Sequence, residues 1–336
     1  MKCRRSIKFT LIITLLISLL AIATSALSCQ EGYSGPVETL TLGYTPSEAS
    51  CLLYVAEDQG FFSANGVKMI EKTYSTGAEA IQALLKGEVD VAGMSETPFI
   101  NQVFTKQSVS IYANLDKLEY TYLIVRKDRG IQTAADLKGK RIGLPQGTIA
   151  EFYLGRYLQL NGLSMKDVTV VNADPQASAD LITKGNLDGV VIWNPIAYQI
   201  EQQVGDNAMV FHVQSGQAAY GLAVARSDWL TAHKELIERS LRAIAQAEQY
   251  MISHPAEAKA MVQKRLNYDT AYMDTVWSEN QFSLSLDQSL VVALEDESRW
   301  LLGNNLTPEK SAPDFLKYIY PDALHAVKPD AVNIIR

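Results

Sequence analysis

The sequence predicts an α/β protein of two similar lobes with a helical C-terminal part. Its 336 residues are 47% apolar, which is enough for a large buried core and suits two domains. Short β-rich runs alternate with helical runs, a pattern that indicates βαβ units and a mainly parallel sheet. The alternation restarts near residue 120, which is why we expect a second lobe.

The overall balance of residues excludes three classes of protein. A net charge of -7 lacks the basic excess of a nucleic-acid binder. A mean hydropathy of -0.02 is too low for a polytopic membrane protein. Three cysteines are too few for a disulfide scaffold.

The N-terminus departs sharply from this average. Four basic residues lie within the first eight positions, and residues 9–28 carry no charge. A positive start followed by an apolar run is typical of a secretory signal, so we expect residues 1–28 to be a signal peptide; an uncleaved membrane anchor is the alternative. The run ends in Ala26-Leu27-Ser28-Cys29, which resembles a lipoprotein cleavage box and makes Cys29 the expected lipidation site.

Cleavage before Cys29 changes both the charge and the cysteine pairing. It leaves 26 basic against 37 acidic side chains, a net charge of -11. If Cys29 is acylated, Cys51 has no partner; if it is not, a Cys29–Cys51 disulfide is an option in an oxidising compartment. The sequence leaves both alternatives open.

The first lobe is predicted from runs that end at glycine or at turn residues. Apolar and β-branched runs predict strands, and runs with helical periodicity predict helices. The expected strands are 39–44, 67–74, 89–93 and 109–113, and the expected helices are 49–59, 78–86 and 98–104.

The second lobe repeats this alternation, and the C-terminal part then changes character. The expected strands are 120–126, 141–144, 168–171, 189–193, 209–213 and 221–225, and the expected helices are 134–137, 148–160 and 177–183. Beyond Asp228, longer amphipathic runs predict helices over 236–252, 256–266, 271–277 and 290–302.

Two segments of the chain echo each other. Residues 83–90 and 181–188 each contain a helix end, a glycine (Gly87 or Gly185) and an aspartate that opens a buried strand. Helix–glycine–strand junctions look alike in many proteins. The second α/β run around residues 181–188 nevertheless favours two related lobes.

No pattern of reactive residues predicts catalysis, a metal site or a bound cofactor. None of the four histidines stands at metal-ligand spacing from another histidine or a cysteine. The chain has no glycine-rich phosphate loop and no G-x-S-x-G elbow.

Polar side chains instead follow the expected strands of both lobes. In open α/β sheets, ligands bind at the carboxyl ends of strands, where helix N-termini point. Any single one of these residues could simply cap a helix, but both lobes present the same kind of end. The candidate ligand-binding residues are Tyr44, Thr45, Ser47, Thr76, Ser95, Glu96, Thr97, Gln146, Thr148, Asp174 and Trp193.

The composition of these loops limits the solute. They contain no lysine or arginine, which a multiply charged anion would normally recruit. Glu96 and Asp174 are able to accept hydrogen bonds from an amino group, and Trp193 is either core or a wall that stacks on a ligand. These features favour a neutral, monoanionic or zwitterionic compound.

Five segments carry a resemblance to a known family: Leu42-Gly43-Tyr44, residues 56–62 with Asn65-Gly66-Val67, residues 87–92, residues 136–143, and residues 188–195. In this order and spacing, over about residues 39–270, the chain resembles the substrate-binding proteins of ABC importers in the sulfonate/nitrate/taurine group. That group also includes carriers of thiamine-pyrimidine precursors.

The resemblance implies the periplasmic-binding-protein type II fold, in which two crossover strands join two α/β lobes around a hinge-closing cleft. We place the crossovers at 122–126 and 222–226. Lobe 1 is then residues 39–125 plus 226–336, and lobe 2 is residues 126–225. The family's ligand contacts carry over to Thr45, Ser47, Thr76, Ser95, Thr97, Gln146, Thr148 and Trp193, whereas Asn194 stands where the family often has an acidic residue.

The same resemblance implies a monomeric, extracytoplasmic carrier that is not an enzyme. Its partners would be a small solute, an ABC permease with its cytoplasmic ATPase, and the membrane, through a cleaved signal or a lipid on Cys29. A sulfonate or taurine-like solute is favoured, with a thiamine-pyrimidine precursor or nitrate as the alternative. A pyrimidine synthase on the same fold is disfavoured because this chain lacks the cysteine cluster and histidines of that branch; a sensory domain tethered by residues 9–28 is a third alternative.

Overall fold

The computed structural model describes residues 33–214 and 216–335. Residues 36–336 form one compact unit, which contains both sheets and all the helices named below. The expected signal peptide and the expected lipidation site, Cys29, lie outside the described residues. Within the described residues, no helix combines the length and the apolar character needed to cross a membrane.

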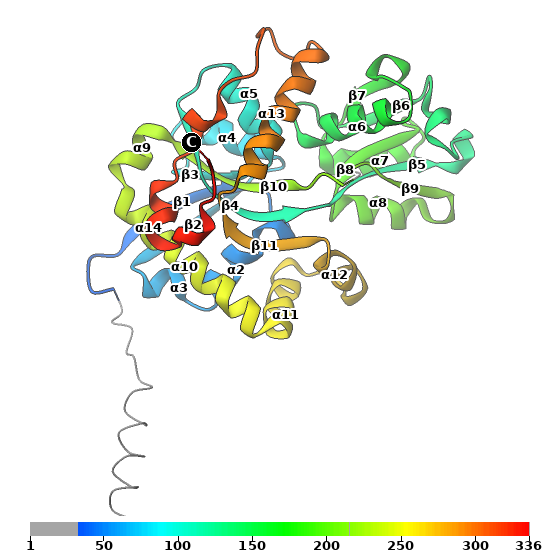
Figure 1. Cartoon of the computed structure of the whole chain (residues 1–336). Coiled ribbons are helices and arrows are strands. Elements are labelled where there is room, and N and C mark those ends of the chain that lie inside the picture. The colour runs from blue at the N-terminus through cyan, green and yellow to red at the C-terminus, as the bar shows by residue number, and fades with distance from the viewer. Residues whose placement is uncertain (1–32, 215, 336) are drawn as a thin grey trace, which may run out of the picture. The chain divides into compact units, whose positions relative to one another are not determined.

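The strands form two separate sheets (Figure 1). We call the elements around the six-stranded sheet, of order β11-β4-β10-β3-β1-β2, the first lobe. Its strands are β1 (Glu38–Tyr44), β2 (Val67–Thr73), β3 (Val91–Met94), β4 (Val109–Leu118), β10 (Ala219–Arg226) and β11 (Asn280–Ser285). The second lobe surrounds a five-stranded sheet of order β7-β6-β8-β5-β9, with strands β5 (Thr121–Arg126), β6 (Arg141–Leu144), β7 (Thr169–Asn172), β8 (Gly189–Trp193) and β9 (Ala208–His212).

Helices pack against both sheets. Those before β10 are η2 (Glu48–Ser50), α2 (Cys51–Asp58), α3 (Phe61–Ala64), α4 (Gly77–Leu85) and α5 (Glu96–Phe104) in the first lobe, and η3 (Lys127–Arg129), η4 (Ala134–Leu137), α6 (Ile149–Leu160), η5 (Met165–Asp167), α7 (Pro175–Thr183), α8 (Ile196–Val204) and η6 (Gly205–Asn207) in the second. After β10 come α9 (Ser227–Ala232), α10 (Lys234–Ser253), α11 (Pro255–Leu266), α12 (Thr270–Trp277), α13 (Gln288–Gly303), η7 (Phe315–Tyr318), α14 (Asp322–Val327) and η8 (Pro329–Ala331).

The C-terminal helices return to the first lobe, where orange and red segments lie among blue ones in Figure 1. The long amphipathic helix α10 contacts α2, α3 and α14. Its apolar stripe, which includes Leu241 and Ile244, is buried, and a proline at position 255 prevents the helix from continuing.

Strand directions are mixed, so the expectation of a mainly parallel sheet was wrong. β1 runs parallel to β2 and β3, and β6 runs parallel to β7 and β8. β10, however, is antiparallel to both β3 and β4, and β5 is antiparallel to both β8 and β9. β11, which comes from the C-terminal part, is antiparallel to β4. β5 and β10 each enter a sheet from the other lobe and so run against their neighbours.

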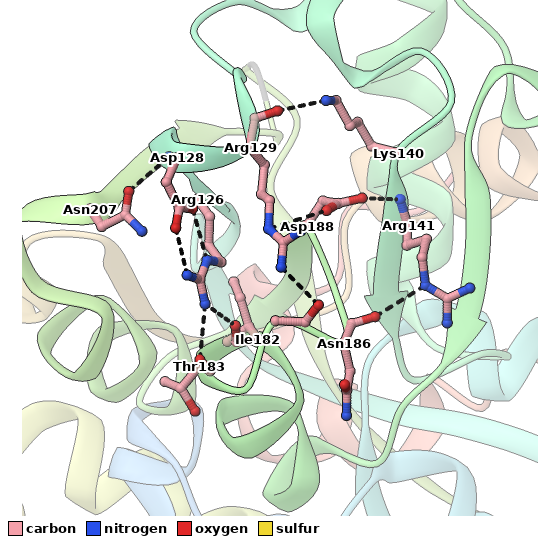
Figure 2. A network of polar contacts seen from close by, with 11 residues as sticks. Arg126, Asp128, Arg129, Lys140, Arg141, Ile182, Thr183, Asn186, Asp188 and Asn207 are labelled. Carbon is pink, nitrogen blue, oxygen red and sulfur yellow. Dashed lines mark hydrogen bonds and ion pairs between the residues drawn. The ribbon is translucent and has the colours of Figure 1, made fainter.

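The two echoing segments form the same structure in both lobes. Asp90 Oδ2 accepts a hydrogen bond of 2.8 Å from the backbone N–H of Thr41, and Asp188 Oδ2 accepts one of 2.8 Å from that of Arg141. Each aspartate follows a glycine with positive φ, at positions 87 and 185, and precedes a strand that pairs in parallel with the strand of its donor. Figure 2 shows this arrangement in the second lobe.

The two strands that cross between lobes also end alike. Arg126, at the end of β5, donates to the carbonyl oxygens of Ile182 and Thr183 at the end of α7, as Figure 2 shows. Arg226, at the end of β10, donates to the carbonyl oxygen of Leu84 at the end of α4. In both lobes an arginine on the entering strand therefore satisfies carbonyl groups that a helix end leaves open.

Two connections join the lobes. One runs from the end of β4 at Leu118 to the start of β5 at Thr121, and the other from the end of β9 at His212 to the start of β10 at Ala219. β5 pairs in the second sheet and β10 pairs in the first. Strand pairing therefore favours lobe boundaries just before β5 and just before β10, about six residues earlier than the expected boundaries at 125/126 and 225/226. The division into lobes at those boundaries remains a prediction.

Four α-helices and one strand among the described residues were absent from the sequence expectations: α3, α8, α9, α14 and β11. In α8, Ile196, Ala197, Ile200 and Val204 recur at helical spacing, a signal that the sequence expectations overlooked. β11 has the sequence NQFSLS, whose polar residues hide the strand pattern.

Candidate functional site

A cavity of about 80 Å³ lies where the carboxyl ends of β1, β3 and β8 meet the start of α6. We call it the central cavity. Both lobes line it, and so do the ends of the connections between them. Its lining residues are Tyr44, Thr45, Ser47, Ala49, Ser50, Leu53, Gly77, Gly93, Met94, Ser95, Pro98, Leu115, Leu118, Tyr120, Thr148, Ile149, Trp193, Tyr220, Gly221 and Leu222.

The candidate ligand-binding residues divide into two groups. Six line the central cavity: Tyr44, Thr45, Ser47, Ser95, Thr148 and Trp193. Five are not among its lining residues: Thr76, Glu96, Thr97, Gln146 and Asp174.

Helix capping accounts for two of the residues outside the lining. Thr76 Oγ1 accepts a hydrogen bond from the backbone N–H of Glu79, and Asp174 Oδ1 accepts one from that of Gln176. Their polar atoms therefore serve the first turns of α4 and α7. Gln146 is exposed, and the donor it provides is its backbone N–H, which bonds to Asn172.

Glu96 and Thr97 lie beneath the cavity wall, not on it. Glu96 is 2% exposed and accepts a hydrogen bond from the backbone N–H of Tyr220, a residue of the lining. The Thr97 hydroxyl donates to the buried carboxyl of Glu297. These two side chains shape the wall from behind.

Three hydroxyl groups in the lining are left free for a ligand. Ser47 and Ser95 hold N-cap positions, but neither side chain makes a capping hydrogen bond. Thr45 Oγ1 is buried and has no hydrogen-bond partner among the described residues. Because a buried hydroxyl without a partner is costly, the cavity is suited to a polar guest. The Thr148 hydroxyl donates to Pro145 O and retains its capacity to accept.

Aromatic rings form the other walls. Trp193 and Tyr120 lie with ring centroids 6.5 Å apart and planes tilted by 35°. The Tyr220 hydroxyl bonds to Ser289 and the Tyr44 hydroxyl donates to Glu71, so both phenols are engaged outside the cavity lining. The rings therefore present mainly apolar faces.

No lysine, arginine, aspartate or glutamate is among the lining residues. The N-terminus of the 12-residue helix α6 meets the cavity at Thr148 and Ile149, and its backbone N–H groups favour a negative group. Behind the wall lies Lys117, whose Nζ is 5.6 Å from the centre of the Tyr220 ring and 2.5 Å from Asp287. The site is thus suited to at most one negative charge on the solute.

Buried carboxyl groups surround the first-lobe side of the cavity. Burial raises the pKa of Glu48 to about 7 and that of Glu96 to about 8, and each directly follows a lining serine. Glu48 also accepts hydrogen bonds from Tyr268 and Tyr272, at 3.3 and 3.4 Å. Near neutral pH, Glu96 is therefore mostly uncharged, which limits repulsion of an anion.

One buried side chain ties the two interlobe connections together. Gln214, in the second connection, accepts hydrogen bonds from the backbone N–H groups of Tyr120 and Thr121 and donates to the carbonyl oxygen of Leu118. It also contacts the Tyr153 hydroxyl on α6. Because Leu118 and Tyr120 line the cavity, Gln214 fixes the floor of the site as well as the joint.

Sequence reasoning missed the lining residues that lie at the joint, among them Leu118, Tyr120 and Gly221. They belong to strands β4 and β10 or to the connections, and their apolar character gave no polar signal. The signal that would have found them is positional, because the ends of crossover strands meet at the cleft of such folds.

A family model described as "NMT1/THI5 like" matches residues 49–258, more than half of the chain and most of both lobes. This chain belongs to the NMT1/THI5-like family. Among curated relatives, the taurine-binding periplasmic protein of Escherichia coli is 24% identical over 201 residues, which are 59% of this chain and 62% of that protein.

Solved structures share the fold of this family member. The alkanesulfonate-binding protein SsuA of Xanthomonas axonopodis, bound to MOPS, is similar with a TM-score of 0.74 at 19% identity, over 86% of this chain and all of that one. The desulfurization enzyme DSZB is similar with a TM-score of 0.60 at 17% identity, over 86% of this chain and 99% of that one. At such identities these likenesses show the fold alone.

Proposed function

We propose that the protein is the extracytoplasmic solute-binding component of an ABC importer and that its solute is a small sulfonate of the taurine type. The observation that carries this proposal is the central cavity itself. It joins free hydroxyl groups and a helix N-terminus to aromatic walls, without a lysine or arginine. A sulfonate spreads one charge over three acceptor oxygens, which hydroxyl and backbone N–H donors are able to bind.

The size of the cavity supports a compact solute. At about 10–15 Å³ for each water-sized occupant, 80 Å³ holds roughly five to eight such groups. Taurine is of this size, whereas a peptide or a nucleotide is far larger. The names of the taurine-binding relative and of the alkanesulfonate-binding structural neighbour agree with this choice.

A thiamine-pyrimidine precursor is the second candidate, because Trp193 and Tyr120 offer two faces on which a flat ring is able to stack. Catalysis is less well supported, even though one structural neighbour is a desulfurization enzyme. Cys51, the cysteine among the described residues, is fully buried, and burial raises the pKa of its thiol well above the usual value. Such a thiol is a poor nucleophile.

The proposed partners are a membrane permease and its cytoplasmic ATPase, which a solute carrier outside the membrane requires. We further propose that residues 1–28 direct export and that Cys29 becomes the lipid-bearing first residue of a monomer. Mass spectrometry of the mature chain tests this directly. An acylated N-terminal Cys29 is expected, and an unprocessed Met1 would contradict the export proposal.

Calorimetric titration of the mature chain with taurine, ethanesulfonate, nitrate and an aminopyrimidine tests the solute. We expect saturable binding of one solute per chain, tightest for a sulfonate. Preference for the aminopyrimidine would select the second candidate. No binding by any of them, together with measured turnover of a sulfinate, would contradict a carrier.

A further inference from the structure

A second cavity, of about 230 Å³, lies between the second lobe and the C-terminal part and shares no lining residue with the central cavity. We call it the rear cavity. The second lobe contributes residues of β5, α8 and β9, and the C-terminal part contributes residues of α12 and the loop after it. Its lining residues are Tyr122, Ile124, Asn194, Ala197, Tyr198, Glu201, Val210, His212, Tyr272, Thr275, Val276 and Glu279.

Carboxyl groups outnumber basic groups in this lining, and the one basic group, His212, acts electrostatically on Glu279. Glu201 and Glu279 contribute carboxyl groups, Glu119 lies close enough to Glu279 to act on it electrostatically, and no lysine or arginine is among the lining residues. His212 is the remaining group able to carry charge, and its ring meets that of Tyr122 edge-on at 5.2 Å. An anion is therefore disfavoured here.

The two carboxyl oxygens of Glu279 differ in their hydrogen bonding. Its Oε1 accepts a hydrogen bond of 2.5 Å from the Tyr122 hydroxyl. Its Oε2 is buried and has no hydrogen bond of good geometry, although the Asn194 amide lies beside the carboxyl group. Because Asn194 provides only this poorly aligned donor, Oε2 is under-satisfied, and a protonated amine would add a stronger, charge-assisted bond.

Aromatic rings complete the surroundings. Tyr198 and Tyr272, one from each side of the cavity, lie with ring centroids 4.8 Å apart, and Tyr122 provides a third ring. The faces of such rings attract cations. A bare metal ion is not suited, because no group of three or more His, Cys, Asp or Glu side chains able to hold one occurs among the described residues.

We propose that the rear cavity is a second binding site and that it takes a small organic ammonium ion. The ammonium group donates to Oε2 of Glu279, its alkyl substituent contacts the tyrosine rings and Val276, and the exposed carboxyl of Glu201 adds long-range attraction. This site is distinct from the central cavity in its lining and in the sign of charge it prefers.

The test uses the mature chain and methylammonium chloride as the probe, whose N–H groups can donate to Glu279 and whose methyl signal is followed by saturation-transfer NMR, with sodium chloride at equal ionic strength as the reference. We expect saturable binding that Glu279→Gln and Tyr198→Ala each weaken about tenfold. Glu235→Gln, an exposed carboxyl at the start of α10, is the matched control and should leave the affinity unchanged.

Three results would overturn the proposal. They are the absence of saturable binding to the wild type, equal affinity in wild type and in Glu279→Gln and Tyr198→Ala, and loss of binding on Ser95→Ala, which would place the cation in the central cavity. Circular dichroism verifies folding of each variant. If Glu279→Gln does not fold, Glu201→Gln, which changes an exposed carboxyl group, replaces it in the test. Wild-type affinity for the probe in both Glu201→Gln and Tyr198→Ala would then overturn the proposal.

Discussion

The first and second lobes share a frame, yet they contribute different chemistry to the cavity between them. In both, an aspartate at the start of a parallel strand binds the backbone of the neighbouring strand, and an arginine on the entering strand caps a helix end. Around the cavity the likeness stops. The first lobe places buried carboxyl groups behind its free serines, whereas the second contributes a helix start and Trp193.

The two lobes also differ in net charge. Residues 121–218 carry nine basic and nine acidic side chains, so the net charge of -11 expected for residues 29–336 lies outside the second lobe. The repeated residues hold the frame, and we propose that the residues that differ select the solute. Five predictions test this division.

The largest expected effect concerns the repeated aspartates. Asp90→Ala and Asp188→Ala should each lower the free energy of unfolding by about 2 kcal/mol, because each removes a charge-assisted hydrogen bond to a strand N–H. Urea denaturation measures both, with exposed Asp330→Ala as the control. A loss in one lobe alone would break the equivalence of the two frames.

Trp193→Leu should weaken sulfonate binding about 30-fold, or roughly 2 kcal/mol, because it removes the aromatic wall that the second lobe contributes. Calorimetry gives the dissociation constant. Trp277→Leu is the matched control, since Trp277 packs against Phe282 and does not line the central cavity. Equal effects of the two changes would remove the second lobe from the site.

Smaller effects should separate lining residues from capping residues in each lobe. Ser95→Ala and Thr148→Ala should weaken sulfonate binding by about 1 kcal/mol each, as the loss of one hydrogen bond does. Thr76→Ala and Asp174→Ala should instead cost about 1 kcal/mol of stability and leave affinity unchanged, because their side chains cap helices. Weaker sulfonate binding by Thr76→Ala or Asp174→Ala would show that the capping residues contact the solute as well.

The smallest expected effect is on pH dependence, and it belongs to the first lobe. Because burial raises the pKa of Glu96 to about 8, its carboxyl gains charge beside the cavity as pH rises through that value. The affinity for ethanesulfonate should fall a few-fold between pH 6 and pH 9, as roughly expected for a screened like charge. In Glu96→Gln the fall should be smaller; an unchanged pH profile would contradict the role given to this carboxyl.

The same carboxyl affects stability with a defined sign. The folded-state pKa of Glu96 lies above its ordinary value of 4.5, so the folded chain binds more protons than the unfolded chain between these values. Stability is therefore highest below about pH 4.5 as far as this group is concerned, and is lost as pH rises toward about 8. Thermal unfolding of Glu96→Gln should show a weaker decline over this window.

Much of the frame could be predicted because local patterns determine it. The strands at 141–144 and 189–193 have the expected bounds, since each is a short apolar run next to a glycine or a turn. The roles of Asp90 and Asp188 follow from a repeated junction. Strand direction could not be predicted, because it depends on which lobe β5 and β10 enter, and no local pattern encodes that choice.

The candidate site was predictable only in part, for a physical reason. A serine or threonine after a strand is the same sequence signal whether its hydroxyl caps the next helix, as in Thr76, or faces a cavity, as in Ser95. The two uses differ only in three dimensions. Glu96 was predicted to contact the solute because it is polar, but its side chain is buried and is not part of the cavity lining. Tyr120 lines the cavity, but it was not predicted because it belongs to no polar strand-end loop.

A crystal structure of the mature chain grown with taurine tests the central claim most directly. We predict density for the solute in the central cavity, with the sulfonate oxygens at the start of α6 and within hydrogen-bond distance of Ser95 and Thr148, and with Trp193 against its carbon atoms. An empty central cavity in crystals whose protein binds taurine in solution, with the solute bound elsewhere, would contradict the account.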